Sequence, residues 1–487
     1  MALLALGVVW IVAARSPALC AAASDHPAFV EPPTLRSPVH LTLDTVVIGD
    51  PRPYAFNYQW YTRAYGSEEP SPVHAPSVPG PTIRVRPGEH LVMRIRNKLG
   101  TNGQASSFEK PCTSRFCDLN TTNLHTHGLH VSPRCGDGEA CQDDIFVHIP
   151  PGGEQWYNFS LPANHMAGTH WYHPHNHHST ASQAGGGAHG ALIVEDPDGS
   201  LPEEYAGMSE KVVVITCIDL RGSEFSAPID NQGGIEEEAS GDLWKFLGTN
   251  GGGAGQYVGL GPAAVIALVN GLYMPELAVK EAQWNRFRLL YAATHLTLSL
   301  RPVSDEAYCE LQLLAKDGVY LNEMPRTIDT VYLASGNRAD VAMRCWCFGE
   351  APCRATIESS PQWTSECAQT TSGSTSFSEC ANPLGAVSQP TFNQTLLHVV
   401  VTSSGARDSV RRGSPLRRIK VNRPCYLADL RHVNVPEKNR GRVDFWAPPT
   451  YLVAWSSKTR GDLFTGQPML VEDTATELHT VNVGEVQ

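Results

Sequence analysis

Histidine is concentrated in one stretch of the chain, residues 168–190, which reads GTHWYHPHNHHSTASQAGGGAHG. It contains His170, His173, His175, His177, His178 and His189. Fifteen of the nineteen histidines lie at or before His189, which composition alone does not explain. Neutral imidazoles bind transition metals, whereas crowded imidazoles that become protonated repel one another and can act as a pH switch. The stretch therefore indicates either a metal site or a pH-sensitive surface.

The spacing of the histidines favours the metal. His125 and His127 in NLHTHGLH, and His173 and His175 in the dense stretch, each form a His-x-His pair. Residues i and i+2 of a β-strand point to the same face, about 6–7 Å apart, which suits one metal or two adjacent metals. A single pair fits a surface arrangement equally well, but two pairs favour ligation. A pH switch explains the crowding and not the paired spacing.

A zinc hydrolase is a third alternative, because catalytic zinc takes three protein ligands and leaves a position for water. Neither cluster shows the His-x-His-x-Asp-His run of metallo-β-lactamase-like hydrolases. The helical His-Glu-x-x-His of zinc proteases is also missing from both clusters.

Strands must position these histidines. The chain has 487 residues, of which 18% are charged and 41% hydrophobic, with 42 Gly and 36 Pro, a composition that favours many short strands joined by turns. Alternating patterns predict an all-β protein of consecutive Greek-key β-sandwiches with a partial third domain. We expect domains at 34–198, 209–403 and 415–487, after a signal peptide at 1–23. Within the first domain, residues 82–99 and 144–162 each read as a hairpin.

Charge and motifs exclude several classes of function. The net charge of −12 argues against nucleic acid as a partner, and the one basic run, residues 411–423, is expected to be an exposed linker. The glycine-rich residues 248–261 lack the Gly-Lys-Ser/Thr ending of a phosphate loop, so a loop is expected there. The apolar run at residues 3–14 is too short to span a bilayer. We therefore predict no stable membrane span.

Cysteine usage fits a secreted, disulfide-containing glycoprotein. Cys20 would leave with the signal peptide, and the other twelve of the 13 cysteines form an even set. The candidate local pairs are Cys112/Cys117, Cys135/Cys141 and Cys367/Cys380, and a disulfide role is expected for the cluster Cys345-Trp346-Cys347. The Asn-x-Ser/Thr sites Asn120, Asn158 and Asn393 fit glycosylation.

Four segments in the first domain resemble the first cupredoxin domain of the multicopper oxidases, the laccase-like family, in order and spacing. They are PGPTIRVRPGEHLVMRIRNKL, NLHTHGLHVSP, DDIFVHIPPGGEQWYNFSLP and GTHWYHPHNHHSTASQAGGGAHGALIVED. VNGLYMPELAVKEAQWNRFRLLYAATHLTLSL resembles the start of that family's second domain. The resemblance implies cupredoxin domains and a trinuclear copper cluster that reduces dioxygen to water.

The resemblance also implies roles for single residues. His125 would bind the type 2 copper, and His127, His173 and His175 would bind the type 3 pair. Asp143 resembles the family's acidic residue near the cluster, where a carboxylate could relay protons, although a solvated aspartate at a strand end explains it as well. The other histidines of the dense stretch would lie around the cluster or at the surface: His170, His177, His178 and His189.

The electron-entry half of such an enzyme is missing from the sequence. The family's type 1 copper is held by a His-Cys-His signature, and no cysteine here has histidine on both sides. The third domain's His-Pro-x-His-x-His is also missing. Either a three-domain oxidase is cut before its last ligands, or the protein keeps half a cluster and binds copper or zinc without oxidase activity.

We accordingly expect a copper-dependent oxidoreductase by resemblance, with dioxygen and a phenol, amine or metal ion as its substrates. The chain as given is expected to be inactive without a type 1 site. After copper loading it should show neither blue absorption at about 600 nm nor oxygen uptake with a phenol.

Overall fold

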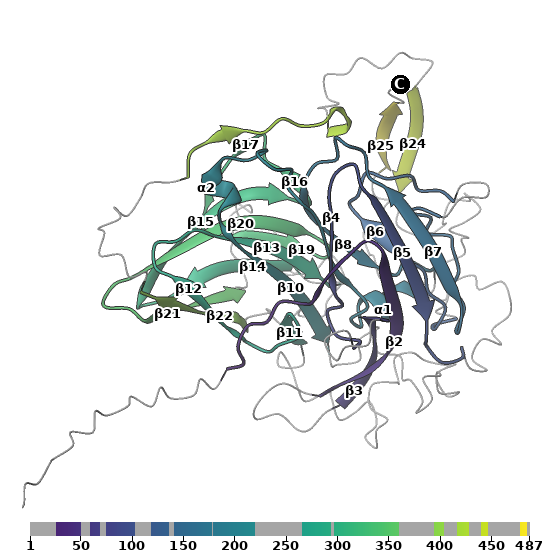
Figure 1. Ribbon diagram of the computed structural model, residues 1–487, viewed down its shortest axis with the longest axis horizontal. Coiled ribbons are helices and arrows are strands. Elements are labelled where there is room, and N and C mark those ends of the chain that lie inside the picture. Colours follow the sequence, from purple (N-terminus) through teal and green to yellow (C-terminus); the bar gives the residue numbers. More distant parts are fainter. Residues whose placement is uncertain are drawn as a thin grey trace, which may run out of the picture.

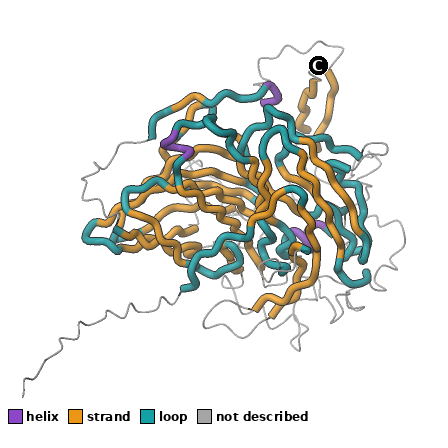
Figure 2. Tube along the Cα trace, viewed as in Figure 1, coloured by secondary structure: helices purple, strands orange, loops and turns teal. Residues whose placement is uncertain are grey.

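The computed structural model describes twelve stretches of the chain: 26–49, 59–68, 75–102, 118–135, 141–177, 179–219, 265–293, 297–359, 394–403, 416–427, 440–446 and 478–484. Strands dominate them, and helix occurs only as short pieces (Figure 2). The expectation of an all-β fold is confirmed. The signal peptide, the glycine-rich segment, Asn393 and the pairs Cys112/Cys117 and Cys367/Cys380 lie outside the described residues.

The first sandwich (β1–β9) consists of a five-stranded sheet in the order β1-β4-β9-β8-β6 and a four-stranded sheet in the order β3-β2-β5-β7 (Figure 1). Its elements are β1 Thr34–Arg36, β2 Val39–Gly49, β3 Gln59–Ser67, β4 Thr82–Val85, β5 His90–Asn97, β6 His125–His127, β7 Glu154–Ser160, β8 Gly168–His173, α1 Thr180–Ala184 and β9 Gly190–Val194. Alternate residues fill the space between the sheets, as on β5, where Leu91, Met93 and Ile95 are fully buried. The period-2 pattern of the sequence is thus satisfied.

The two predicted hairpins are wrong. β4 pairs with β1 and β9, whereas β5 pairs with β2 and β7, so the turn at Gly88 carries the chain from one sheet to the other. In residues 144–162 only β7 is a strand, and its partner is β5. Alternation shows that one face of a strand is buried. It cannot show which of two facing sheets the strand joins.

The second sandwich (β10–β22) follows a short helix, α2 Glu203–Ala206, and pairs a seven-stranded sheet with a five-stranded sheet. The strands of this segment are β10 Ser209–Asp219, β11 Val265–Val269, β12 Glu276–Lys280, β13 Asn285–Ala292, β14 Thr297–Val303, β15 Ala307–Lys316, β16 Val319–Tyr320, β17 Glu323–Met324, β18 Arg326–Ile328, β19 Val331–Ala334, β20 Arg338–Cys347, β21 Cys353–Ser359 and β22 Gln394–Thr402. Of these, β17 belongs to neither of the two sheets. The domain limits 34–198, 209–403 and 415–487 stay predictions.

The chain after β22 is described only in short pieces. They are β23 Ile419–Lys420, which pairs with β17, a 3-10 helix at Cys425–Leu427, and an antiparallel pair of β24 Arg440–Trp446 with β25 Leu478–Gly484. Within the predicted linker 411–423, Leu416 is buried but Arg417 and Arg418 are exposed. No helix among the described residues is long and apolar enough to cross a membrane.

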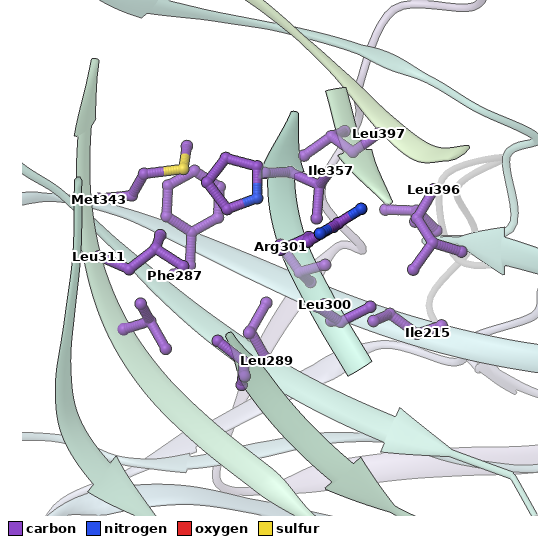
Figure 3. A pocket seen from close by; sticks show the side chains of 15 residues that line it. Ile215, Phe287, Leu289, Leu300, Arg301, Leu311, Met343, Ile357, Leu396 and Leu397 are labelled. Atoms are coloured by element: carbon purple, nitrogen blue, oxygen red, sulfur yellow. The ribbon is translucent and has the colours of Figure 1, made fainter. Parts of the chain in front are cut away.

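A narrow cavity of about 40 Å³ lies between the sheets of the second sandwich (Figure 3). Phe287, Leu289, Leu300 and Met343 line it, and Arg301 is the one charged residue among the lining residues. A void of this size without several convergent polar groups does not meet the description of a ligand site. The functional site is therefore expected in another part of the molecule.

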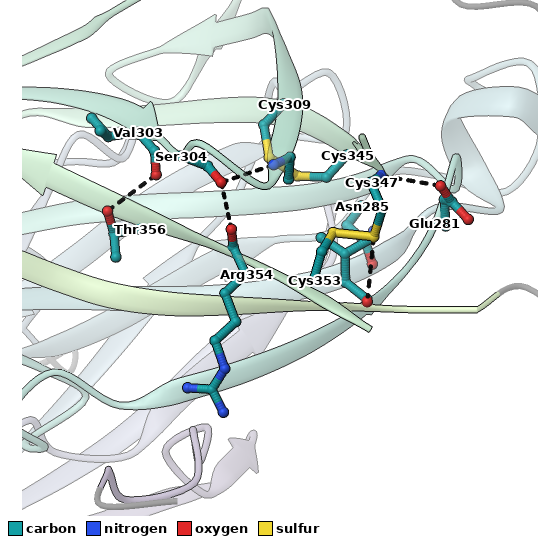
Figure 4. The surroundings of a disulfide bond; sticks show 12 residues. Glu281, Asn285, Val303, Ser304, Cys309, Cys345, Cys347, Cys353, Arg354 and Thr356 are labelled. Carbon is teal, nitrogen blue, oxygen red and sulfur yellow. Dashed lines mark hydrogen bonds between the residues drawn. A yellow bond between two sulfur atoms is a disulfide. The ribbon is translucent and has the colours of Figure 1, made fainter. Parts of the chain in front are cut away.

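Disulfides reinforce the second sandwich at one end (Figure 4). Cys309 on β15 bonds Cys345 on β20, and Cys347 bonds Cys353 at the start of β21. Both cysteines of the Cys345-Trp346-Cys347 cluster are thus in disulfides, as predicted. The predicted pair Cys135–Cys141 is also bonded in the first sandwich.

One other prediction is corrected by burial, and one exposed cysteine lies outside the disulfides. Cys425 is that free, exposed thiol. Asn120 has no exposed surface, and its amide Nδ2 donates to the carbonyls of Gly100 and Thr101. The folded chain therefore has no room for a glycan on Asn120, while Asn158 is partly exposed.

The two sandwiches meet sheet against sheet. Trp171 on β8 and Ile193 on β9 pack on Val214 of β10 and Leu290 of β13 in one buried apolar cluster. Every residue of β8, β13 and β20 is buried as a result, so these strands show no exposed face. The strand that carries His173 lies inside this contact.

His189 is fully buried in the same region and is not a surface residue. Its Nδ1 donates to the Ala184 carbonyl at 2.9 Å, and its Nε2 lies 2.9 Å from the Thr216 hydroxyl on β10. Burial lowers the pKa of His189 from 6.5 to about 4 because the charged imidazolium is poorly solvated there.

This pKa predicts an acid sensitivity. Between pH 6.5 and about 4 the unfolded chain binds a proton that folded His189 does not, so the free energy of unfolding falls as the pH is lowered through this window. The loss from this one residue is on the order of 3 kcal/mol. Urea denaturation of the metal-free protein at about pH 7 and about pH 5 measures the change. His189→Gln keeps a donor and an acceptor and should show a shallower decline; an identical decline would contradict the assignment.

Candidate metal centre

Two strands of the first sandwich bring the His-x-His pairs together. β6 runs antiparallel to β8 with His125 opposite His173, Thr126 opposite Tyr172 and His127 opposite Trp171. His125, His127 and His173 therefore share one face of the sheet, while Thr126 and Tyr172 point into the core. As predicted, His125 and His127 lie on the same face of one strand, and this strand is three residues long.

The three imidazoles converge on one point. One ring nitrogen from each of His125, His127 and His173 lies within 4.8 Å of the other two. The closest pair is His127 Nδ1 and His173 Nε2, at 3.3 Å. His175 follows directly after β8, and its ring centroid lies 5.2 Å from that of His125 and 6.1 Å from that of His173. All four predicted histidines thus line one small space.

Hydrogen bonds on the far side of the rings fix which nitrogen faces this space. His125 Nδ1 lies 3.1 and 3.0 Å from the two Asp143 oxygens, so it donates to the carboxylate and leaves Nε2 as the free lone pair. His173 Nδ1 donates to the Pro174 carbonyl at 2.8 Å, which likewise leaves Nε2. Metal-binding histidines are typically oriented in this way.

Asp143 and Asn123 hold the backbone around these rings. Asp143 Oδ1 also accepts the amide of Thr126 at 2.8 Å, between the two ligand candidates of β6. Asn123 Oδ1 accepts the amide of His175 at 2.6 Å, and its Nδ2 donates to the Ile145 carbonyl. Asp143 was predicted near the cluster and lies there. Asn123 was missed, because nothing in its local sequence distinguishes it from an ordinary turn asparagine.

Burial keeps the imidazoles neutral. It lowers the pKa of His173 well below 6.5 and is also the main reason why the pKa of His175 is lowered. The pKa of His127 falls to about 4, first through burial and then through the nearby charge of Arg338. A neutral imidazole has the lone pair that a metal needs, so no proton competes for these nitrogens near neutral pH.

Of the remaining histidines of residues 168–190, His170, His177 and His189 lie outside this space. His170 is buried with 2% of its surface exposed, so the surface alternative is wrong for it as it is for His189. His177 is partly exposed, with its ring 6.2 Å from that of His175. His178 lies outside the described residues.

The comparisons with known proteins agree on one family. Residues 118–199 match the family model described as multicopper oxidase. Copper resistance protein A of Pseudomonas syringae pv. tomato is 30% identical over 139 residues, which cover 28% of this chain and 18% of that protein. An iron transport multicopper oxidase of Saccharomyces cerevisiae is 26% identical over 294 residues, covering 58% of this chain and 39% of that protein.

The chain is also similar to a solved structure at lower identity. A variant of the multicopper oxidase from Aquifex aeolicus superposes with a TM-score of 0.49 and 16% identity, covering 79% of this chain and 66% of that one. The chain spans only 18% and 39% of the length of the two curated relatives.

Proposed function

We propose that the chain binds copper with His125, His127, His173 and His175, as the first-sandwich half of an oxygen-reducing site, since residues 118–199 match the family model of the multicopper oxidases. The observation that carries the proposal is the convergence of three imidazoles, with one nitrogen of each within 4.8 Å of the others. The resemblance assigns His125 to a type 2 copper and the other three to a type 3 pair.

The donor set fits copper. Imidazole is a ligand that copper binds well, and the Nδ1 hydrogen bonds of His125 and His173 leave Nε2 as the unprotonated nitrogen of both neutral rings. Bound copper would supply the redox chemistry, passing electrons from a reducing substrate to dioxygen. The residues of this chain hold the ring nitrogens in place, favour the neutral form of His127, His173 and His175, and bury the site on one side.

Asp143 has two roles in this proposal. It orients His125 through Nδ1, and as the carboxylate next to the site it carries a proton on Oδ1 or Oδ2 toward oxygen that is being reduced. The proximity of both oxygens to His125 Nδ1 supports the first role directly.

Asp143→Asn tests the orienting role, because an amide accepts a hydrogen bond less strongly than a carboxylate does. We expect copper affinity to fall by about 10–100-fold, as it does when the hydrogen-bond partners of metal ligands are removed. Asp144→Asn is the matched control, since Asp144 accepts only a turn amide, that of Phe146, at 2.9 Å. Equal affinities for the two variants, measured by competition with a chelator, would contradict the role of Asp143.

A second candidate function is metal binding without oxidase activity. Two observations favour it: the three converging imidazoles match the number and kind of protein ligands at a catalytic zinc, and no cysteine of the sequence is flanked by histidines to hold a type 1 copper. The reducing substrate of the oxidase alternative, a phenol, an amine or a metal ion, would react at that type 1 site. Secretion and glycosylation at Asn158 and Asn393 remain part of the proposal.

Loading the purified chain with copper and, separately, with zinc distinguishes the two functions. We expect copper to bind at the four histidines without blue absorption at about 600 nm and without oxygen uptake in the presence of a phenol. Blue absorption or oxygen uptake would show that this chain alone holds a type 1 site and would overturn that expectation. Binding of zinc but not copper would favour the non-redox function.

A further inference from the structure

A turn of the second sandwich reaches the metal centre of the first. The turn Ala334–Asn337 closes with a hydrogen bond from Asn337 N to the Ala334 carbonyl at 2.9 Å, and Gly336 adopts a φ of +75° within it. A β carbon added to Gly336 would lie 3.3 Å from Trp171 Cζ2 and 3.6 Å from His127 Cε1. The turn therefore packs directly against a proposed copper ligand.

Arg338, the first residue of β20, extends this contact to both ligand strands. Its Nε donates to the carbonyl of Thr169 on β8 at 3.2 Å. A β carbon on Gly128, the residue after His127, would lie only 2.6 Å from Arg338 Nη2, so the guanidinium rests on the backbone at the end of β6. The side chain is 4% exposed.

The other nitrogens of Arg338 fix the guanidinium in this place. Nη1 donates to the Gly336 carbonyl at 2.8 Å and Nη2 to the Asp317 carbonyl at 3.0 Å. One planar guanidinium group, the fork of N–H donors of Arg338, therefore joins two loops of the second sandwich to one ligand strand of the first. Its N–H donors have fixed relative directions.

The packing around this fork leaves little freedom. His170 lies under it, and a β carbon on Gly318 would come 2.4 Å from His170 Cε1. Gly168, at the start of β8, approaches the Gly318 carbonyl so closely that a β carbon there would overlap it at 2.2 Å. A shift of Arg338 must therefore be passed on to β8 and to the end of β6.

We propose that Arg338 is a positioning residue for the metal centre: it holds His127 and the β8 ligand strand in register from the second sandwich. The inference rests on the proposed copper binding by His127 and His173. Arg338 touches neither the metal nor a substrate, and it acts only through the backbone of β6 and β8 and through the turn that contacts His127.

Arg344 provides a matched control. It lies on the same strand and face as Arg338 and its side chain is 5% exposed. It pairs with Glu310 at 3.0 Å and its guanidinium lies over the rings of Trp284 and Trp346, which all belong to the second sandwich. Replacing either arginine removes a buried guanidinium from β20, and Arg338 is the one that donates to a carbonyl of a ligand strand. A general loss of stability would affect both variants.

Copper affinity of the full chain, measured by chelator competition, tests the proposal in Arg338→Ala, Arg338→Lys and Arg344→Ala. We expect both Arg338 variants to weaken copper binding by about tenfold or more, and Arg344→Ala to change it by less than about twofold. Arg338→Lys keeps the positive charge but cannot form the same planar set of hydrogen bonds, so it distinguishes the effect of positioning from the effect of charge. It is also the variant to measure if Arg338→Ala does not fold. Unchanged affinity in the Arg338 variants, or equal losses in all three, would overturn the proposal.

A second measurement is independent of copper. In the metal-free protein, the NMR resonance of His127 Cε1–H should shift in the Arg338 variants and stay in place in Arg344→Ala. If the wild-type chain binds no copper, the proposed function fails, and this resonance still decides whether Arg338 positions His127. An unmoved resonance in the Arg338 variants would overturn the positioning role.

Discussion

Replacing His127 and His173 together with alanine should remove copper from the candidate centre. The two rings supply the closest pair of ring nitrogens in the site, 3.3 Å apart, and the substitutions take away two of the four proposed ligands. Losing the partner of one ligand costs about 10–100-fold in affinity, so losing two ligands should cost more than about a hundredfold. Metal content after dialysis and chelator competition measure the effect.

His90→Ala is the control, because His90 is exposed on β5 and far in the fold from the β6–β8 pair. Far-UV circular dichroism should show that the double variant remains folded, since the change removes one half-buried and one buried polar ring and no backbone hydrogen bond of the sheets. If the double variant bound as much copper as His90→Ala, the histidines would be a surface cluster and not a site.

The sequence was sufficient to predict which histidines lie close together, but not which residues hold them in place. The i, i+2 spacing placed His125 and His127 on one face, because that geometry is local to a strand. The approach of His173, 46 residues from His127, depended on the family resemblance, since spacing carries no information about which strands pair. The roles of all four histidines as ligands stay predictions.

The contacts between sandwiches could not be predicted. Thr169 and Arg338 are separated by 169 residues, and the strand β20 reads as an ordinary buried strand. The hairpin error at β4 and β5 has the same origin, because a half-buried pattern fixes the face of a strand but not its neighbour. His170 and His189 were placed around the cluster or at the surface, while the contact between two sheets buries both.

Asp340 is the residue whose loss should most reduce stability. It lies on β20, two residues from Arg338 and therefore on the same face, with 1% of its side chain exposed. Its Oδ2 accepts from Arg286 Nη2 at 2.5 Å and from Arg288 Nη1 at 3.0 Å. Its Oδ1 accepts from the Thr169 hydroxyl of the first sandwich at 2.5 Å.

Without this carboxylate, two buried guanidinium groups have less negative charge beside them to balance their positive charge. Arg286 keeps Asp196 at 2.8 Å and Arg288 keeps Glu210 at 2.5 Å, but both arginines are almost fully buried, and solvent cannot replace the lost charge. Breaking a buried ion pair from one side costs about 3–5 kcal/mol. Asp340→Ala should therefore lower the thermal midpoint by on the order of 10 °C.

Two further variants are needed to interpret the thermal midpoint of Asp340→Ala. Asp340→Asn keeps the volume and an acceptor oxygen but not the charge, so its thermal midpoint should lie between those of Asp340→Ala and the wild type. Glu323→Ala breaks a pair with Arg418 at 3.1 Å in which both side chains are more than half exposed, and such a pair is worth at most about 1 kcal/mol. If Asp340→Ala and Glu323→Ala had the same thermal midpoint, Asp196 and Glu210 would be sufficient counter-charges for the two arginines. The contact between the sandwiches would then depend on its apolar cluster at Trp171.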